Sequence, residues 1–144
     1  MTPTGRAPEE AAEELAAEAP DQDWLRAVID RLDAKLRSGE LEHFLSAWDL
    51  SLAEAAEAFG VSRQAVSKWR QSGIPADRMP ALVDLVSATE EIERRVRRER
   101  IPAVVRRPAD SPGGRSLLEM AKAGEHAEVR ETVRRMFDLR RVHP

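Results

Sequence analysis

Five hydrogen-bonding side chains fall on one side of a short helix expected near the middle of the chain. At about 100° per residue, one face of the helix that follows Ser62 carries Arg63, Gln64, Ser67, Lys68 and Gln71. All five can donate hydrogen bonds, and no carboxylate interrupts them. Arginine and lysine match the acceptors of guanine and glutamine matches adenine, so this face has the chemistry for reading bases in a DNA major groove. The alternative is a solvated polar face on an ordinary core helix.

A second short helix and a tight turn are predicted just before this face. Ser51 and Glu54 form a predicted capping box at the start of the first helix. Its expected buried side consists of Leu52, Ala55, Ala56 and Phe59. Gly60 tolerates the positive φ that ends a helix, and Val61 then adds an apolar contact to the core. The pattern predicts two helices that cross closely.

The second helix is predicted to begin at a serine cap and to pack through one side only. Ser62 caps it, and Val66 and Trp69 lie opposite the polar face, where they are expected to be buried. Gly73-Ile74-Pro75 follows where the helix must stop. The residues predicted to contact DNA are Ser62, Arg63, Gln64, Ser67, Lys68, Arg70 and Gln71.

The phrase GVSRQAVSKWRQSGIP resembles the Cro and λ-repressor-like (Xre-type) helix-turn-helix family, over roughly residues 40 to 86. The resemblance implies an all-α bundle that places a recognition helix in the major groove. It also implies a bacterial or phage transcriptional regulator, a repressor that binds a double-stranded operator as a dimer.

Composition sets bounds on the other functions. The chain has no cysteine and three scattered histidines, so neither a disulfide nor a metal centre is expected, and no cofactor is implied. No apolar run approaches the roughly 20 residues of a membrane span, which favours a cytoplasmic protein without a membrane partner. The sequence has no cysteine, no glycine-rich phosphate loop and no histidine beside a plausible nucleophile, so we expect no enzyme and no catalytic residues.

The net charge of −3 is unevenly distributed. The first 23 residues carry seven acids and one base, whereas four bases oppose three acids between residues 50 and 80. Residues 1–20 lack the apolar side chains needed to order them and are interpreted as a disordered acidic arm, with mimicry of phosphate as a minor alternative. The modest positive charge of the remainder favours two copies on DNA.

Residues 21–101 are interpreted as the helix-turn-helix domain with flanking helices. A helix from Asp21 or Asp23 to a stop at Gly39 is expected to carry the apolar stripe Leu25, Val28, Ile29, Leu32 and Leu36. This stripe could pack on its own domain or form dimer contacts. A separate helix from Glu40 to Trp48 is expected to bury Leu41, Phe44, Leu45 and Trp48 and to leave His43 solvated.

A longer helix is expected to open at Pro80 and to end at Ile101-Pro102. Its predicted stripe is Leu82, Leu85, Val86, Thr89, Ile92 and Val96. Five arginines crowd its end, namely Arg94, Arg95, Arg97, Arg98 and Arg100. Cations are favourable at a helix C-terminus without any ligand, and contact with phosphate is the alternative.

Residues 102–144 are interpreted as a small helical interaction module. Prolines and glycines break the chain before a helix capped by Ser116, and a last helix runs from Glu125 to about Asp138. The run from Ile101 to Asp138, with Pro108 and the GGRS turn, resembles the toxin-binding domain of the Xre/MbcA/ParS antitoxin family. The residues predicted to bind the partner are Arg115, Ser116, Leu117 and Met120.

The alternative function is therefore an antitoxin that occludes an NAD-consuming toxin through this module and represses its own operon. On either hypothesis the last 40 residues hold too few apolar side chains for a core of their own. They are expected to fold semi-independently and to lean on a second copy or on a toxin.

Overall fold

The computed structural model describes residues 22–109 and 112–142. Over these residues the fold is all-α, as predicted, and the only β-type pairing there is an isolated bridge between Pro108 and Ser116. The acidic segment 1–20 lies outside the described residues. Among the helices described, none is both long and apolar enough to cross a bilayer.

The first described helix, α2 (Gln22–Trp48), is continuous over 27 residues, so the predicted stop at Gly39 is wrong. An interior glycine costs a helix only about 0.5–1 kcal/mol relative to alanine, and tertiary packing outweighs this. That packing comes from the C-terminal part of α2, which buries Leu41, Phe44, Leu45 and Trp48 as expected. The helix ends instead at Asp49, whose φ of 53° is left-handed.

Two short helices follow, α3 (Leu52–Phe59) and α4 (Arg63–Ser72). The predicted capping box is confirmed, because Ser51 Oγ accepts from the Glu54 amide and Glu54 accepts from the Ser51 amide, both at 3.1 Å. Gly60 ends α3 at φ 66°. The predicted burial of Ala55, Ala56 and Phe59 is also confirmed, whereas Leu52 is exposed at the edge of the helix.

A 3₁₀ turn (Ala76–Arg78) leads into α5 (Met79–Glu93), with Pro80 in its first turn as expected. The helix stops at Glu93, before all five residues of the arginine run, and a second 3₁₀ turn (Arg98–Arg100) precedes α6 (Ile101–Arg106). The prediction that Ile101-Pro102 ends a helix is wrong. Proline suits the first turn of a helix as well as the position after its end, because its missing N–H is unpaired there in any case.

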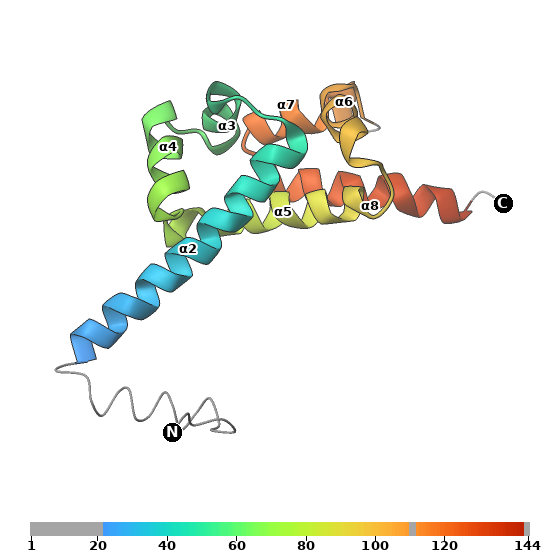
Figure 1. Cartoon of the computed structure of the whole chain (residues 1–144). Coiled ribbons are helices and arrows are strands. Elements are labelled where there is room, and N and C mark those ends of the chain that lie inside the picture. Colours follow the sequence, from blue (N-terminus) through green and yellow to red (C-terminus); the bar gives the residue numbers. More distant parts are fainter. Residues whose placement is uncertain (1–21, 110–111, 143–144) are drawn as a thin grey trace, which may run out of the picture.

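The chain closes with a 3₁₀ turn (Pro112–Gly114), α7 (Leu117–Lys122) and α8 (His126–Val142). Ser116 caps α7 as predicted, accepting from the Glu119 amide at 3.0 Å. α8 continues past the expected end at Asp138. In Figure 1, α5 and α8 lie side by side along one layer of the molecule, and they form the most extensive helix pairing in the fold.

One hydrophobic cluster runs through the described residues, from Leu41 in α2 to Phe137 in α8. It includes Leu117 and Met120 of α7, which pack on α3, and Val129 and Val133 of α8. The surface on which the C-terminal helices were expected to lean therefore belongs to this same chain. The few apolar side chains of α7 and α8 are buried because α7 packs on α3 and α8 packs on α5.

Candidate nucleic-acid interface

The outward face of α4 carries the side chains predicted to read bases. Arg63, Gln64, Lys68 and Gln71 are exposed, and Ser67 is half-buried. Within the described residues, the side chains of Arg63, Gln64 and Lys68 have no hydrogen bond or ion pair, so their donors are available to a ligand. The structure thus brings these groups together on one helix, as predicted.

The inward face of α4 fixes the direction of that outward face. Val66 and Trp69 are buried, and the Trp69 ring meets Phe59 of α3 edge-on with centroids 5.6 Å apart. Phe59 in turn contacts Phe44 of α2 in the same geometry. Rotation of α4 about its axis would expose a tryptophan, so the polar side chains are held toward solvent.

The start of α4 offers partial positive charge. Ser62 Oγ accepts from the Ala65 amide at 3.1 Å, so this predicted contact residue serves as the helix cap. The first amides of a helix lack intrahelical acceptors, and the helix dipole favours an anion beside them. Arg63 lies at this end. A phosphate placed there would meet a cation as well as the dipole.

The acids of α3 are engaged by cations and so do not oppose this charge. Glu57 pairs with Lys122 of α7 at 3.2 Å, and Glu54 lies 3.4 Å from Arg106 of α6. The hydrogen bond from the Ser51 amide, helped by Arg106, lowers the pKa of the Glu54 carboxyl. Glu54 therefore remains charged and bound to its partners.

Arg70 differs from the other predicted contact residues because it joins α4 to α2. Its guanidinium donates to Glu42, which raises the pKa of Arg70, and Ser38 Oγ donates to the Arg70 carbonyl at 2.7 Å. Just beyond, Gly73 has φ 95°, and a Cβ at this position would lie 2.6 Å from the Ala34 carbonyl. Arg70 and Gly73 position α4 against α2 rather than presenting it to a ligand.

The predicted partner-binding residues are not brought together on a surface. Ser116, Leu117 and Met120 are buried, and Arg115 forms a two-armed ion pair with Glu125, with one arm at 3.1 Å. This pairing raises the pKa of Arg115 and lowers that of Glu125. Arg115 therefore stabilises the turn before α7, Ser116 caps this helix, and Leu117 and Met120 belong to the core.

Two further groups make contacts that the sequence did not predict. His43, expected to be solvated, lies 2.7 Å from a Glu93 carboxylate oxygen on α5. Arg106 donates to the carbonyls of Trp48, Pro102 and Asp49 at 2.7–2.9 Å, and so fastens α6 to the junction of α2 and α3. Apart from the bond to Pro102 within α6, these contacts join residues 50 or more apart in the sequence, so no local pattern could indicate them.

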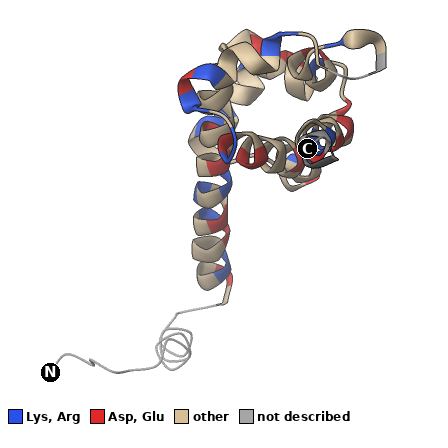
Figure 2. Cartoon of the chain, turned by 90° about the vertical axis from the view of Figure 1, so that its right-hand side faces the viewer, with Lys and Arg blue, Asp and Glu red and all other residues tan. Residues whose placement is uncertain are grey.

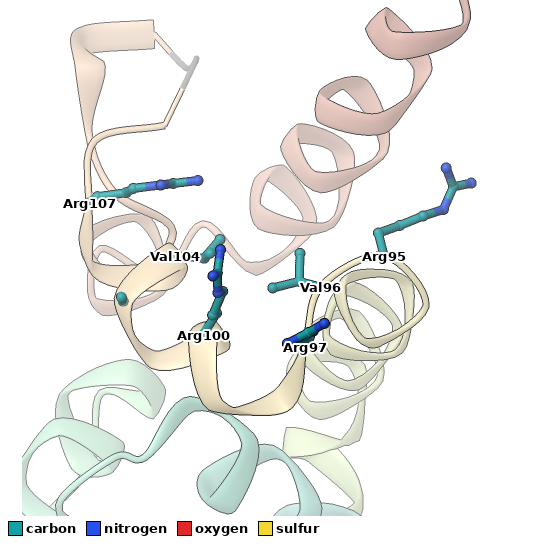
Figure 3. Close-up of a pocket in the computed structure, with 7 residues that line it drawn as sticks. Arg95, Val96, Arg97, Arg100, Val104 and Arg107 are labelled. Carbon is teal, nitrogen blue, oxygen red and sulfur yellow. The ribbon is translucent and has the colours of Figure 1, made fainter.

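The arginine run contributes to a cavity of about 520 Å³ between the end of α5 and α6. Figure 3 shows Arg97 and Arg100 beside this cavity with Arg107 reaching across from the end of α6, whereas Arg95 points away. Arg95 instead lies over the Phe137 ring, 5.4 Å from its centroid. The residues that line the cavity belong to α6 and the segment after α5, which lie away from α4 in Figure 1, and none of them belongs to α4.

In comparisons with known proteins, no family model, curated protein or solved structure matches the chain.

Proposed function

We propose that this protein is a sequence-specific DNA-binding regulator, a repressor of bacterial or phage type that inserts α4 into the major groove. The observation that carries the proposal is the outward face of α4, where Arg63, Gln64 and Lys68 present unpaired donors while Val66 and Trp69 anchor the opposite face. A helix held rigidly by one side is the arrangement that base reading requires.

The pairing of α3 with α4 supports the same proposal. The two helices are joined by a tight turn at Gly60, each has its own serine cap, and the resemblance to the Cro-like family covers both. We assign base contacts to Arg63, Gln64, Ser67 and Lys68. Gln71 lies at the far end of the helix, and Ser62 and Arg70 act by positioning it.

Two copies on one operator follow from the charge. Arg63 and Lys68 are the only cations on the outward face of the described α4, and few phosphate contacts give weak binding at physiological salt. A dimer doubles these contacts and reads two half-sites. The antitoxin alternative has no such support, because the residues assigned to toxin binding are buried or paired within the chain.

Selection of DNA from a random pool with the full chain tests the proposal. Arg63→Ala is expected to weaken binding to the selected site about 10- to 100-fold, because a bidentate base contact is worth about 1–3 kcal/mol, and to change binding to random DNA little. Fluorescence anisotropy with both DNAs measures the two effects.

Arg134→Ala is the matched control, because this exposed arginine lies on α8, away from α4. It should leave both affinities unchanged. Failure to enrich any sequence would refute the proposal, and equal losses on both DNAs would reassign Arg63 to phosphate contact.

A further inference from the structure

The N-terminal half of α2 extends well beyond the rest of the molecule, as Figures 1 and 2 show. Large apolar side chains are exposed along it, with Ile29 at 50%, Leu32 at 58% and Leu36 at 72% of full exposure. A monomeric protein rarely leaves such a row in water. This segment, residues 22–39, is called the arm below and is distinct from the acidic segment of residues 1–20.

Ile29, Leu32 and Leu36 form one seam together with the half-buried Leu25. The exposed Trp24 lies to the side of this seam, one residue before Leu25. Leu25, Ile29, Leu32 and Leu36 are separated by four, three and four residues, which is the a/d spacing of a coiled coil. Ala34 and Ser38, which meet Gly73 and Arg70 of the α4 segment, lie on the opposite side of the helix. The seam therefore faces away from α4 and is not an unfilled part of the contact between α2 and α4.

We propose that the seam binds the seam of a second copy of this chain, with the two arms antiparallel. In the register that places Leu25 opposite the second copy's Leu36, Ile29 falls opposite its Leu32, and the two-fold axis repeats both layers. The four layers then contain only leucine and isoleucine. Self-complementarity of this kind favours a second copy over an unrelated protein.

The charges that flank the seam agree with this pairing. In the same register Arg26 faces Asp33 of the second copy on one edge, and the axis generates the reciprocal pair. On the other edge Lys35 meets the neutral Val28, so no like charges are opposed. Figure 2 shows acidic and basic residues interspersed along the whole arm.

The body excludes the parallel alternative. His43 lies seven residues beyond Leu36 on the same side of α2 and is bonded to Glu93 of α5, so α5 occupies the continuation of the seam. In a parallel dimer, the C-terminal part of the partner's α2 would run into α5. The helices packed around each α2 would then have to occupy the same space. In the antiparallel arrangement the described part of the partner's arm begins there, beside a depression of about 430 Å³ lined by Leu36, Gly39 and Val86.

Residues 1–21 are poorly suited to cover the seam in place of a second copy. Apart from Met1, Leu15 is their only large aliphatic or aromatic side chain, and most of the other residues are Ala, Glu and Pro. One leucine cannot fill four layers. The inference concerns the protein without DNA, so its success or failure does not depend on the proposed function.

Sedimentation velocity over a wide concentration range tests the proposal on the full chain without DNA. The wild type is expected to dimerise reversibly. Leu32→Asp should weaken the dimer about 100-fold or more, because a symmetric interface contains the change twice, and Leu36→Ser about 10-fold. Helix content by circular dichroism should be almost unchanged, because these side chains contact little of their own body.

Val83→Asp is the control, since Val83 is also an exposed apolar residue but lies on α5. It should dimerise like the wild type. A wild type that stays monomeric at every concentration overturns the proposal, and so does a dimer that survives both arm substitutions.

The absence of cysteine allows the orientation to be tested by cross-linking. Leu25→Cys mixed with Leu36→Cys should form a disulfide-linked dimer under mild oxidation, whereas neither variant should cross-link to itself. Cross-linking of each variant to itself, but not in the mixture, would show parallel arms and overturn the antiparallel arrangement.

Discussion

The α3–α4 pair and the α7–α8 pair look alike in sequence and differ in what they expose. In each pair a glycine-containing turn leads to a short helix capped by serine, Ser62 for α4 and Ser116 for α7. Yet α4 buries only Val66 and Trp69 over ten residues, whereas α7 buries four of its six. α4 retains a free polar face, and α7 is enclosed between α3 and α8.

This difference shows what a capping motif determines. The cap and the glycine fix where a helix begins, because they satisfy local amides and local φ angles. The exposed face depends on which other segments pack against the helix. A binding site assigned from a sequence motif therefore needs evidence that its side chains reach the surface. The polar side chains of α4 do reach the surface, whereas Leu117 and Met120 of α7 are buried.

Among the changes that test this comparison, truncation after Arg107 is expected to have the largest effect on stability. It removes Leu117, Met120, Val129 and Val133 from the shared core and uncovers the faces of α3 and α5 that they fill. Each lost contact of this size costs a few kcal/mol, against a typical total stability of about 5–15 kcal/mol. We expect loss of cooperative thermal unfolding, measured by circular dichroism.

Deletion of residues 1–20 is the control and should leave the melting temperature nearly unchanged, because the described core begins at Leu41. A truncated chain that still melts cooperatively would show that α7 and α8 form a separate module, as the sequence alone predicted.

Single substitutions within α4 should separate its two faces. Trp69→Ala is expected to lower the free energy of unfolding by about 3–5 kcal/mol, since the indole is buried against Phe59. Lys68→Ala should change it by less than about 0.5 kcal/mol, because the side chain is exposed. Urea unfolding of both variants gives the comparison, and similar values would mean that α4 has no outward face.

The smallest expected effect is a pH dependence at the start of α3. The pKa of Glu54 is held below the ordinary value of 4.5, chiefly by the Ser51 amide, so its stabilisation is present above that value. It is lost as the pH falls through the lowered pKa of the folded state. Glu54→Gln should therefore destabilise the protein at neutral pH and make little difference in strong acid.

Melting curves between acid and neutral pH measure this dependence. Glu90→Gln, at an exposed position on α5, should track the wild type throughout. A Glu54→Gln variant whose deficit persists unchanged into strong acid would show that the carboxylate charge has no role.

Local signals predicted much of this fold. The caps at Ser51, Ser62 and Ser116 and the stop at Gly60 are confirmed, because each depends on residues within one turn. The buried side of α4 followed from helical periodicity. The outward direction of Arg63 and its neighbours, the main part of the candidate site, followed from the same pattern.

The errors share a different cause, which is packing between distant segments. Gly39 does not end α2 because the helix continues into the core, and Pro102 begins a helix whose last turn Arg106 ties to Trp48. Leu117 and Met120 are core residues because α3 and α8 cover them. None of these contacts leaves a periodic or capping signal in the sequence.

The close approach of Gly73 to Ala34 sets a rule for how this sequence can vary. Any side chain at position 73 would collide with the backbone of α2, so position 73 must stay glycine wherever α2 and α4 keep this contact. Position 34 must stay small for the same reason. If the proposed function is correct, relatives that recognise other DNA sequences should differ at positions 63, 64 and 68. They should still share glycine at 73 and a small residue at 34, and this pair would help to recognise them when little other similarity remains.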